Sequence, residues 1–427
     1  MAKAYSRRTM LGIAGRAALL AGAAPWVCRA EKSAAISAGI VIAGDVTAAQ
    51  AGQQVLADGG NAVDAAAAAA LTACVVAQAS CGAGGYGGHA TIAPAGEKKI
   101  VSLDYNTVAP EAARADMYPL DKSGAVVGGV NSAGWLAVGV PGTLAGIQLA
   151  VERYGTRPLG ELLAPAIALA REGFPVSAAF AKAILSSMVG LKHSPGAAKI
   201  LLKADGSPYA AGQLYRNPAL AAMLETLAKR NSVDSFYRGD IAQRFAEVSQ
   251  KNGGLVTAKD LASYTALEVP PLEQEWNGFE LHTAPLTAGG LTVFQAINLL
   301  KAMGWTREKA GTLRTQGKVE ALRLAWRDRL SLLGDPAKTD VPVKKLLSWD
   351  YALESAKAVE KAVHDQKPLE FRPFKTSDSG TMHISAADRH GNMAAMTLTQ
   401  GAAFGSKVGI EELGTPLWSG LRPTSRA

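Results

Sequence analysis

The chain has 427 residues, of which 48% are hydrophobic and 19% charged, an ordinary balance for a folded protein with a sizeable core. This length allows about three domains or one large α/β unit. The formal net charge is +8, but the basic residues form no patch interleaved with aromatic side chains, which argues against nucleic-acid binding. Beyond residue 30 no apolar run approaches the roughly 20 residues of a membrane span, and the scattered histidines have no ligand-like spacing for a metal.

Residues 1–30 have the pattern of an export signal. A twin-arginine motif at 6–12 precedes the apolar run 13–27, and Cys28-Arg29-Ala30 offers small residues where a signal peptidase cleaves. Removal of this segment takes away five basic residues and no acid, so the formal charge falls from +8 to +3. The sequence therefore predicts a periplasmic or secreted protein. The alternatives are a basic N-terminal helix and lipid attachment at Cys28, for which the lead-in is poor.

The rest of the chain is typical of one α/β unit, with strands at both ends and helices between them. Asn61 is placed to cap a tightly packed, alanine-rich helix that runs to about Gln78, and a Gly-rich stretch follows at 82–88. The other elements are predicted from periodicity and turn residues. The predicted helices are 142–154, 159–171, 177–187, 218–229, 253–264, 290–303 and 319–333, and the predicted strands are 90–93, 100–104 and 279–282.

The Gly-rich stretch leaves two uses open. Its backbone N–H groups could cradle a phosphate or an oxyanion. Alternatively, the glycines could serve a tight loop that needs positive φ and close backbone approach. The stretch lacks the Gly-Lys-Ser/Thr ending of a P-loop, and no strand precedes it as in a dinucleotide fingerprint.

Three polar residues, Asp328, Arg329 and Asp335, are given structural roles. Asp328-Arg329 is expected to form a salt bridge on a helix, and Asp335 to lie in a turn. Cys74 and Cys81 are seven residues apart across a helix end. An oxidising compartment would permit a disulfide, but the separation is unfavourable and the pairing stays open.

The most informative point of the chain is the Gly380-Thr381 bond. Residues 376–380 are small and polar, 381–387 is typical of a strand, 388–392 supplies turn residues, and 393–400 is the returning strand. A threonine exposed by cleavage at the start of a hairpin offers a hydroxyl nucleophile and, on the same residue, an α-amine as its base. Threonine is common in strands, so this interpretation needs support from the rest of the chain.

Support comes from a series of segments in a fixed order. They are GGNAVDAA (59–66), the Gly-rich loop 82–88, LDYNTVAP (103–110), VGVPGT (138–143), LLAPAIALAREGFPVS (162–177), FYRGDIA (236–242), NGGLVTAKDL (252–261), LGDP (333–336), TMHISAADRHGN (381–392) and FGS (404–406). On these segments, over roughly residues 36–410, the chain resembles the γ-glutamyltransferases, members of the N-terminal-nucleophile hydrolases. The resemblance implies an αββα sandwich without a cofactor.

The resemblance also implies a mechanism. Thr381 would attack the Gly380 carbonyl and cleave the chain, and would then attack a γ-glutamyl or related amide of a small molecule. Water or an amino acid would resolve the acyl-enzyme, and Thr399 would orient the nucleophile. The implied regions are a signal peptide (1–30), a large-subunit region (31–380) and the start of a small-subunit region (381–427), the two cleaved pieces forming an intramolecular heterodimer.

Departures from the family pattern fall on the substrate contacts. The family arginine that clamps the glutamyl α-carboxylate falls at Asn106, and a family asparagine falls at Gly401. We take Asn106, Gln400 and Gly401 as candidate substrate-binding positions, and a different acyl or amide substrate is plausible.

The resemblance fades beyond Ile410, before the family's paired serines and Gly-Gly oxyanion segment, so the small-subunit layer is expected to be incomplete. Two hypotheses therefore stay open. The first is a self-cleaving hydrolase. The second is a truncated or inactive homologue with a binding or structural role.

Overall fold

A central antiparallel sheet brings together strands from both ends of the chain. The structure, a computed structural model, describes residues 38–114, 116–286, 288–304, 311–334, 339–370 and 379–419. The predictions for the export signal, Asp335 and residues 376–378 lie outside these ranges. The sheet has the order β1-β9-β10-β2-β3-β6. Its strands are β1 (Gly39–Ala43), β2 (Gly87–Ala93), β3 (Val101–Asp104), β6 (Leu267–Val269), β9 (Ser379–Asp388) and β10 (Met393–Ala402).

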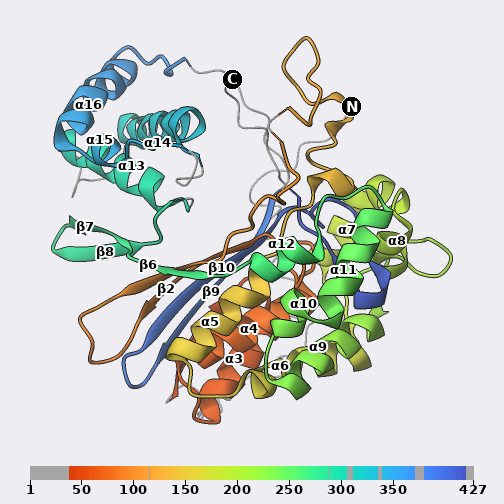
Figure 1. Cartoon of the computed structure of the whole chain (residues 1–427). Helices are drawn as coiled ribbons and strands as arrows, with labels where there is room; N and C mark the ends of the chain where they lie inside the picture. The colour runs from red at the N-terminus through yellow and green to blue at the C-terminus, as the bar shows by residue number, and fades with distance from the viewer. Residues whose placement is uncertain are drawn as a thin grey trace, which may run out of the picture.

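Helices cover one face of this sheet (Figure 1). The innermost is α4 (Ala62–Val76), in which all 15 residues are buried. Its alanines explain this burial, because small side chains let the sheet and the neighbouring helices approach closely. The other helices of this layer are α3 (Val46–Ala57), α5 (Thr143–Tyr154), α6 (Leu159–Glu172), α7 (Ala178–Lys192), α8 (Pro195–Leu201), α9 (Pro218–Arg230), α10 (Asp234–Arg238), α11 (Asp240–Lys251) and α12 (Ala258–Ser263).

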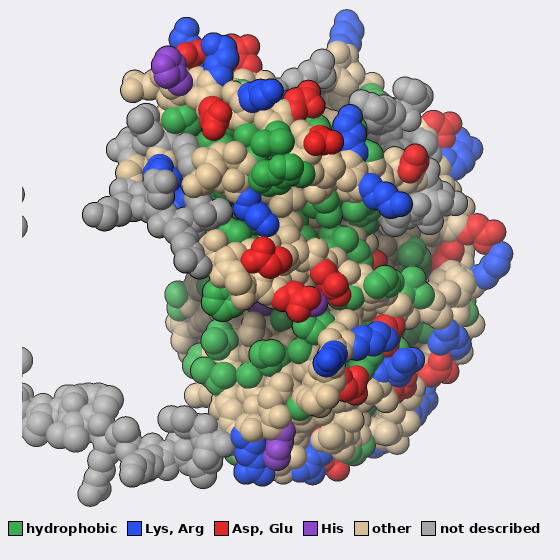
Figure 2. Space-filling model, turned by 90° about the vertical axis from the view of Figure 1, so that its left-hand side faces the viewer, with side chains coloured by type: hydrophobic (Ala, Val, Ile, Leu, Met, Phe, Trp, Pro, Cys, Tyr) green, Lys and Arg blue, Asp and Glu red, His purple; other side chains and the backbone are tan. Residues whose placement is uncertain are grey.

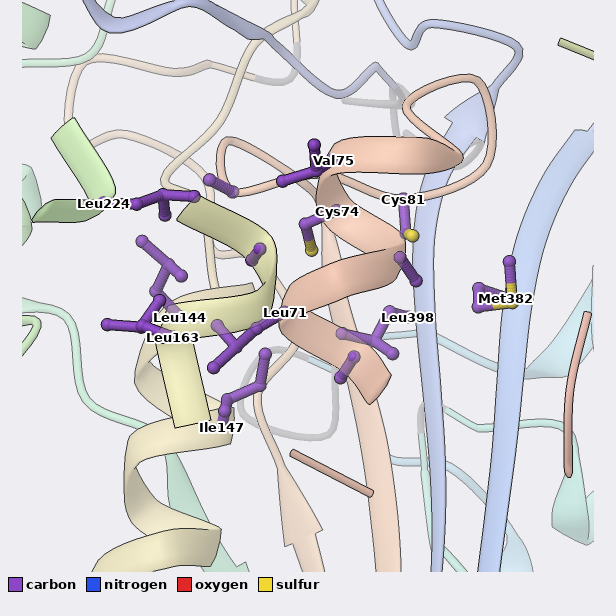
Figure 3. Close-up of a cluster of buried hydrophobic side chains, with 14 of the residues drawn as sticks. Leu71, Cys74, Val75, Cys81, Leu144, Ile147, Leu163, Leu224, Met382 and Leu398 are labelled. Atoms are coloured by element: carbon purple, nitrogen blue, oxygen red, sulfur yellow. The ribbon is translucent and has the colours of Figure 1, made fainter. Parts of the chain in front are cut away.

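The main core is built around α4 (Figure 3). Leu71 lies toward Leu144 and Ile147 of α5, while Leu398 of β10 closes the sheet side. Cys74 and Cys81 are both buried here as free thiols. Burial of side chains of this size stabilises by about 1.5–3 kcal/mol each, so this cluster fixes the sheet against the helix layer.

A carboxylate ties the β9–β10 turn to the start of α4. Asp388 accepts hydrogen bonds from the backbone N–H groups of Ala62 (3.0 Å), His390 (2.8 Å) and Asn392 (3.1 Å). It also accepts one from the Asn392 side-chain amide (2.7 Å). Burial alone would raise the pKa of Asp388, but these N–H donors hold it below its usual value. The predicted turn at 388–392 is confirmed, and it is anchored at a helix N-terminus, where an anion is favoured.

A second, smaller lobe lies on the other side of the sheet (Figure 1). It has its own core, which includes Leu299, Leu324 and Val359. Its helices are α13 (Gly290–Ala302), α14 (Thr312–Leu332), α15 (Val343–Leu346) and α16 (Trp349–His364). Three two-stranded ribbons complete the described strands: β4 (Phe174–Pro175) with β5 (Leu214–Tyr215), β7 (Leu272–Trp276) with β8 (Phe279–Thr283), and β11 (Gly409–Ile410) with β12 (Thr415–Pro416).

In the lobe, the predicted pairing of Asp328 with Arg329 is wrong. Asp328 pairs with Arg327 at 2.7 Å and accepts a hydrogen bond from the Tyr351 hydroxyl at 2.6 Å, which ties α14 to α16. Arg329 instead donates to the Ala288 carbonyl at 2.8 Å. Among the helices of the described ranges, none combines the length and the apolar composition of a membrane span.

Candidate active site

The two threonines singled out in the sequence face each other across the β9–β10 ladder. The Thr399 Oγ1 atom lies 3.1 Å from Thr381 Oγ1, 2.9 Å from the Gly380 carbonyl oxygen and 2.9 Å from the Gly401 backbone nitrogen. A carbonyl oxygen can only accept a hydrogen bond and a backbone N–H can only donate one, so the Thr399 hydroxyl donates its single proton to the Gly380 carbonyl. The Thr381 hydroxyl must then donate to Thr399, which leaves the Thr381 lone pairs beside the bond predicted to be cleaved.

A bulge in β10 creates this geometry. The register between β9 and β10 shifts between Thr399 and Gly401, and Gly401 has a φ of +81°. A Cβ at Gly401 would lie 2.5 Å from the Ser419 carbonyl oxygen, so the position requires glycine. Gln400, which falls inside the bulge, is fully buried and donates to the Pro416 carbonyl at 3.3 Å. Of the three candidate substrate-binding residues, the structure thus turns Gln400 away and gives Gly401 a backbone contact with Thr399.

Thr381 and Thr399 open into a cavity of about 930 Å³ between the sheet and the small lobe. Asn106, the third candidate, lines the same cavity. The space-filling view shows hydrophobic side chains around a hollow between the two parts (Figure 2). The cavity is large enough for a small-molecule substrate. Its remaining polar lining from the sheet consists of His89, Thr91, His383, Ser385 and Thr397.

The cavity side of the sheet is organised in cross-strand rows. In one row Thr381 pairs with Thr399, and Thr399 pairs with Gly87. The next row holds four polar residues, because Thr397 pairs with both His383 and His89, and His89 pairs with Asp104. In this second row His383 Nδ1 lies 2.8 Å from Thr397 Oγ1, and His89 Nε2 lies 3.5 Å from Asp104 Oδ1. The partial removal of His383 from water lowers its pKa.

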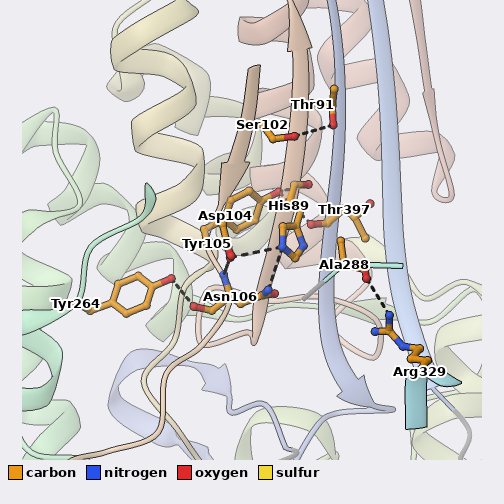
Figure 4. Close-up of polar contacts among 10 residues, drawn as sticks. All are labelled: His89, Thr91, Ser102, Asp104, Tyr105, Asn106, Tyr264, Ala288, Arg329 and Thr397. Carbon is orange, nitrogen blue, oxygen red and sulfur yellow. Dashed lines mark hydrogen bonds and ion pairs between the residues drawn. The ribbon is translucent and has the colours of Figure 1, made fainter. Parts of the chain in front are cut away.

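Asn106 is held from three sides (Figure 4). Its backbone N–H donates to Asp104 Oδ1 at 3.0 Å, and its carbonyl accepts from the Tyr264 hydroxyl at 2.7 Å. Its side-chain amide nitrogen lies 3.1 Å from His89 Nε2. The position predicted to match a carboxylate-binding arginine is therefore a neutral amide next to an acidic side chain.

The Gly-rich loop is a packing element rather than an anion cradle. Its N–H groups are used inside the protein: Gly84 donates to Thr415 Oγ1 (3.1 Å), Gly85 to the Gly82 carbonyl (2.9 Å) and Tyr86 to the Thr399 carbonyl (2.9 Å). Gly87 has a φ of +99°, and a Cβ there would lie 1.8 Å from the Tyr105 carbonyl oxygen. The tight-loop interpretation is confirmed, and the loop holds the strand that carries Thr399.

Trp418 is a structural residue of the site that the sequence did not reveal. It is fully buried, donates through its indole N–H to the Gly139 carbonyl at 3.1 Å, and meets Tyr86 edge to face with ring centroids 4.9 Å apart. Its backbone N–H donates to the Gly84 carbonyl at 3.2 Å. Trp418 therefore supports the Gly-rich loop, although it lies beyond the last segment of the resemblance.

Sequence reasoning also missed His89, Asp104 and His383 as site residues. In the sequence they could have been found as polar side chains at alternate positions of strands, a spacing that places them all on one face.

Among the described residues no group of histidine, cysteine and acidic side chains could hold a metal ion.

Comparison with known proteins decides the family. Residues 48–421 match the family model for gamma-glutamyltranspeptidase. The chain belongs to this family. It is 34% identical over 379 residues to a glutathione hydrolase proenzyme of Pseudomonas sp. strain A14. The aligned region covers 87% of this chain and 64% of that protein. The chain thus spans just under two thirds of the length of this curated relative.

Solved structures agree with the predicted α/β fold class of the N-terminal-nucleophile hydrolases. The Helicobacter pylori gamma-glutamyltranspeptidase superposes with a TM-score of 0.70 at 30% identity, over 78% of this chain and 93% of that one. A cephalosporin acylase from Bacillus halodurans superposes with a TM-score of 0.75 at 27% identity, over 90% of this chain and 69% of that one. The chain is therefore similar both to a transpeptidase and to an acylase.

Proposed function

We propose that this protein is a self-cleaving amide hydrolase or acyltransferase of the gamma-glutamyltranspeptidase family, with Thr381 as its nucleophile. The observation that carries the proposal is the contact of Thr399 Oγ1 with both the Thr381 hydroxyl (3.1 Å) and the Gly380 carbonyl (2.9 Å). The Thr399 hydroxyl thus contacts both the nucleophile and the carbonyl group that it would attack, and such contacts can orient reacting groups.

In the first step the Thr381 oxygen attacks the Gly380 carbonyl carbon, and the carbonyl oxygen takes up the developing charge next to the Thr399 hydroxyl. The C–N bond then breaks, the proton lost by the Thr381 hydroxyl is taken up by the departing nitrogen, and this nitrogen becomes the α-amine of Thr381. Water hydrolyses the resulting ester and frees the Thr381 hydroxyl. The cleaved pieces are proposed to remain together as a heterodimer of residues up to 380 and from 381 onward.

In the second step the new α-amine, with a reference pKa near 8, takes the proton of the Thr381 hydroxyl as this attacks a substrate amide. The leaving amine departs, and water or an amino acid resolves the acyl-enzyme. The cavity of about 930 Å³ would hold the substrate. Activity on γ-glutamyl amides is expected to be weak, because Asn106 offers no positive charge for the glutamyl α-carboxylate.

Export through the twin-arginine pattern at residues 6–12 belongs to the same proposal, with the periplasm as the expected compartment. A fusion of residues 1–30 to a folded reporter tests it, with Arg7→Lys and Arg8→Lys together as the control. Export of the parent fusion and retention of the double variant support this signal. Equal export of both would contradict it.

Self-cleavage is tested by a denaturing gel with N-terminal sequencing of the purified chain. A fragment that begins Thr381-Met382-His383, absent from the Thr381→Ala variant, supports the proposal. Thr381→Ser, which keeps a hydroxyl, should still cleave. A wild-type chain that is folded and stays intact would favour the alternative of an inactive homologue, and rapid glutathione hydrolysis would refute the role given to Asn106.

A further inference from the structure

The row that carries Thr381 continues past Thr399 and ends at Asn106. Gly88 and Tyr105 exchange backbone hydrogen bonds at 3.3 and 3.0 Å, and His89 pairs with Asp104. Continuation of this register by one residue places Asn106 opposite Gly87. The row thus runs across three strand spacings of about 4.8 Å, so that roughly 14 Å separates the backbones of Thr381 and Asn106.

Between the two ends, Thr399 is the one residue of the row that has a side chain. Gly87 carries no side chain, and the Tyr105 carbonyl lies where a Cβ would be. Thr381, Thr399, Gly88 and Asn106 all line the same cavity. A chain attached to the Thr381 oxygen as an acyl group can therefore lie along the floor of the cavity toward Asn106. The geometry makes Asn106 and its neighbours the far end of the acyl site.

The electrostatics of that end disfavour a carboxylate. Asp104 is three quarters buried, with 24% of its side chain exposed, and lies 3.5 Å from His89 and 3.0 Å from the Asn106 backbone nitrogen. Asn106 itself is neutral, and its side-chain amide meets His89. A second carboxylate beside Asp104 would be repelled by its like charge, and this repulsion is stronger because the site is partly removed from water. An amide or hydroxyl can instead exchange hydrogen bonds with an asparagine amide.

We propose that the acyl site between Thr381 and Asn106 selects acyl chains that end in an uncharged hydrogen-bonding group, a carboxamide or hydroxyl, and rejects chains that end in a carboxylate. Asn106 and Asp104 determine this specificity. The inference rests on the proposed function, since it names the acyl group that Thr381 transfers. It predicts that the preferred substrates are not γ-glutamyl compounds.

The test uses pairs of chromogenic anilides that differ only in the end of the acyl chain. Suberic acid monoanilide is compared with the anilide of its half-amide, because an acyl chain of this length can approach Asn106, and the shorter glutaric acid pair is the control that cannot reach it. We expect the carboxamide-ended member to have a kcat/KM at least about tenfold higher, from repulsion of the carboxylate. In Asn106→Arg the preference should reverse, because a guanidinium binds a carboxylate in a bidentate manner.

Asn106→Met is the matched control, since its side chain is also long but carries no charge. It should not reverse the preference. Equal turnover of both members by the wild type, a preference for the carboxylate, or an unchanged ratio in Asn106→Arg would each overturn the assignment.

A binding measurement separates failure of this inference from failure of the proposed function. The same pairs are titrated against the Thr381→Ala variant, and the dissociation constant of each compound is measured. This measurement probes the acyl site without requiring self-cleavage or catalysis. If no variant turns over any anilide, the proposed function fails, and the ratio of dissociation constants still decides the specificity. Tighter binding of the carboxamide member supports the acyl site, and equal or weaker binding refutes it.

Discussion

Replacing Gly401 with alanine is expected to slow self-cleavage by about tenfold. At a φ of +81° an L-residue with a Cβ costs about 1–2 kcal/mol, and this Cβ would also lie 2.5 Å from the Ser419 carbonyl oxygen. The backbone can relieve the contact only by moving, and the Gly401 N–H then leaves Thr399 Oγ1, 2.9 Å away. A hydrogen bond of this kind contributes about 0.5–1.5 kcal/mol, and 1.4 kcal/mol in the barrier corresponds to a factor of ten.

Gly391→Ala is the matched control, because it imposes the same backbone strain at the other end of the hairpin. Gly391 has a φ of +95°, and the Cβ added by the substitution would have Ala95 Cβ, 3.8 Å away, as its nearest atom. The alanine therefore introduces backbone strain at this position without a steric clash. Both chains are made by cell-free synthesis, and cleavage is followed on denaturing gels. Folded Gly401→Ala that cleaves within twofold of the wild-type rate would refute the positioning role. Equal slowing by Gly391→Ala would show that strain alone is responsible.

Three further predictions concern stability, each measured by urea unfolding of the Thr381→Ala chain. Asp388→Asn should lose about 2–3 kcal/mol, since an amide cannot accept from all of its N–H donors, including that of Ala62; an unchanged midpoint would contradict this. Trp418→Ala should cost about 3–5 kcal/mol as a large buried side chain, and a loss below 1 kcal/mol would argue against its packing role. The pKa of His383 is lowered on folding, so the unfolded chain binds a proton at this residue more readily than the folded chain does. The contribution of neutral His383 to the free energy of unfolding is therefore complete above about pH 6.5, and it declines as the pH falls toward the folded-state pKa. His383→Gln should weaken this pH dependence, and an identical profile would refute it.

The sequence predicted the elements whose signals are local. The hairpin around 388–392 and the helix capped by Asn61 were readable because turn residues and caps act within a few positions. The strand β1 and the helices α3 and α16 were missed, since Val46–Ala57 has little apolar periodicity and Ile40 and Ile42 are exposed on the cavity side. Tertiary contacts rather than local pattern decide such elements.

At the site, the resemblance supplied Thr381 and Thr399, but not the geometry that joins them. The bulge at Gln400 depends on the backbone of Ser419, and the second polar row depends on strand register. Neither is encoded within a single segment, because register is set by the whole sheet. For the same reason the sequence predicts a substrate contact at Gln400, although the structure directs its side chain into the core.

Cleavage before Thr381 would leave two pieces that share one sheet. The hairpin β9–β10 is inserted between β1 and β2, both of which precede the cleavage point, so each of its outer edges is hydrogen-bonded to the other piece. The two pieces would be interlocked, and separating them would break two ladders at once and expose the core under α4. A nicked molecule should therefore unfold in a single cooperative transition rather than dissociate first.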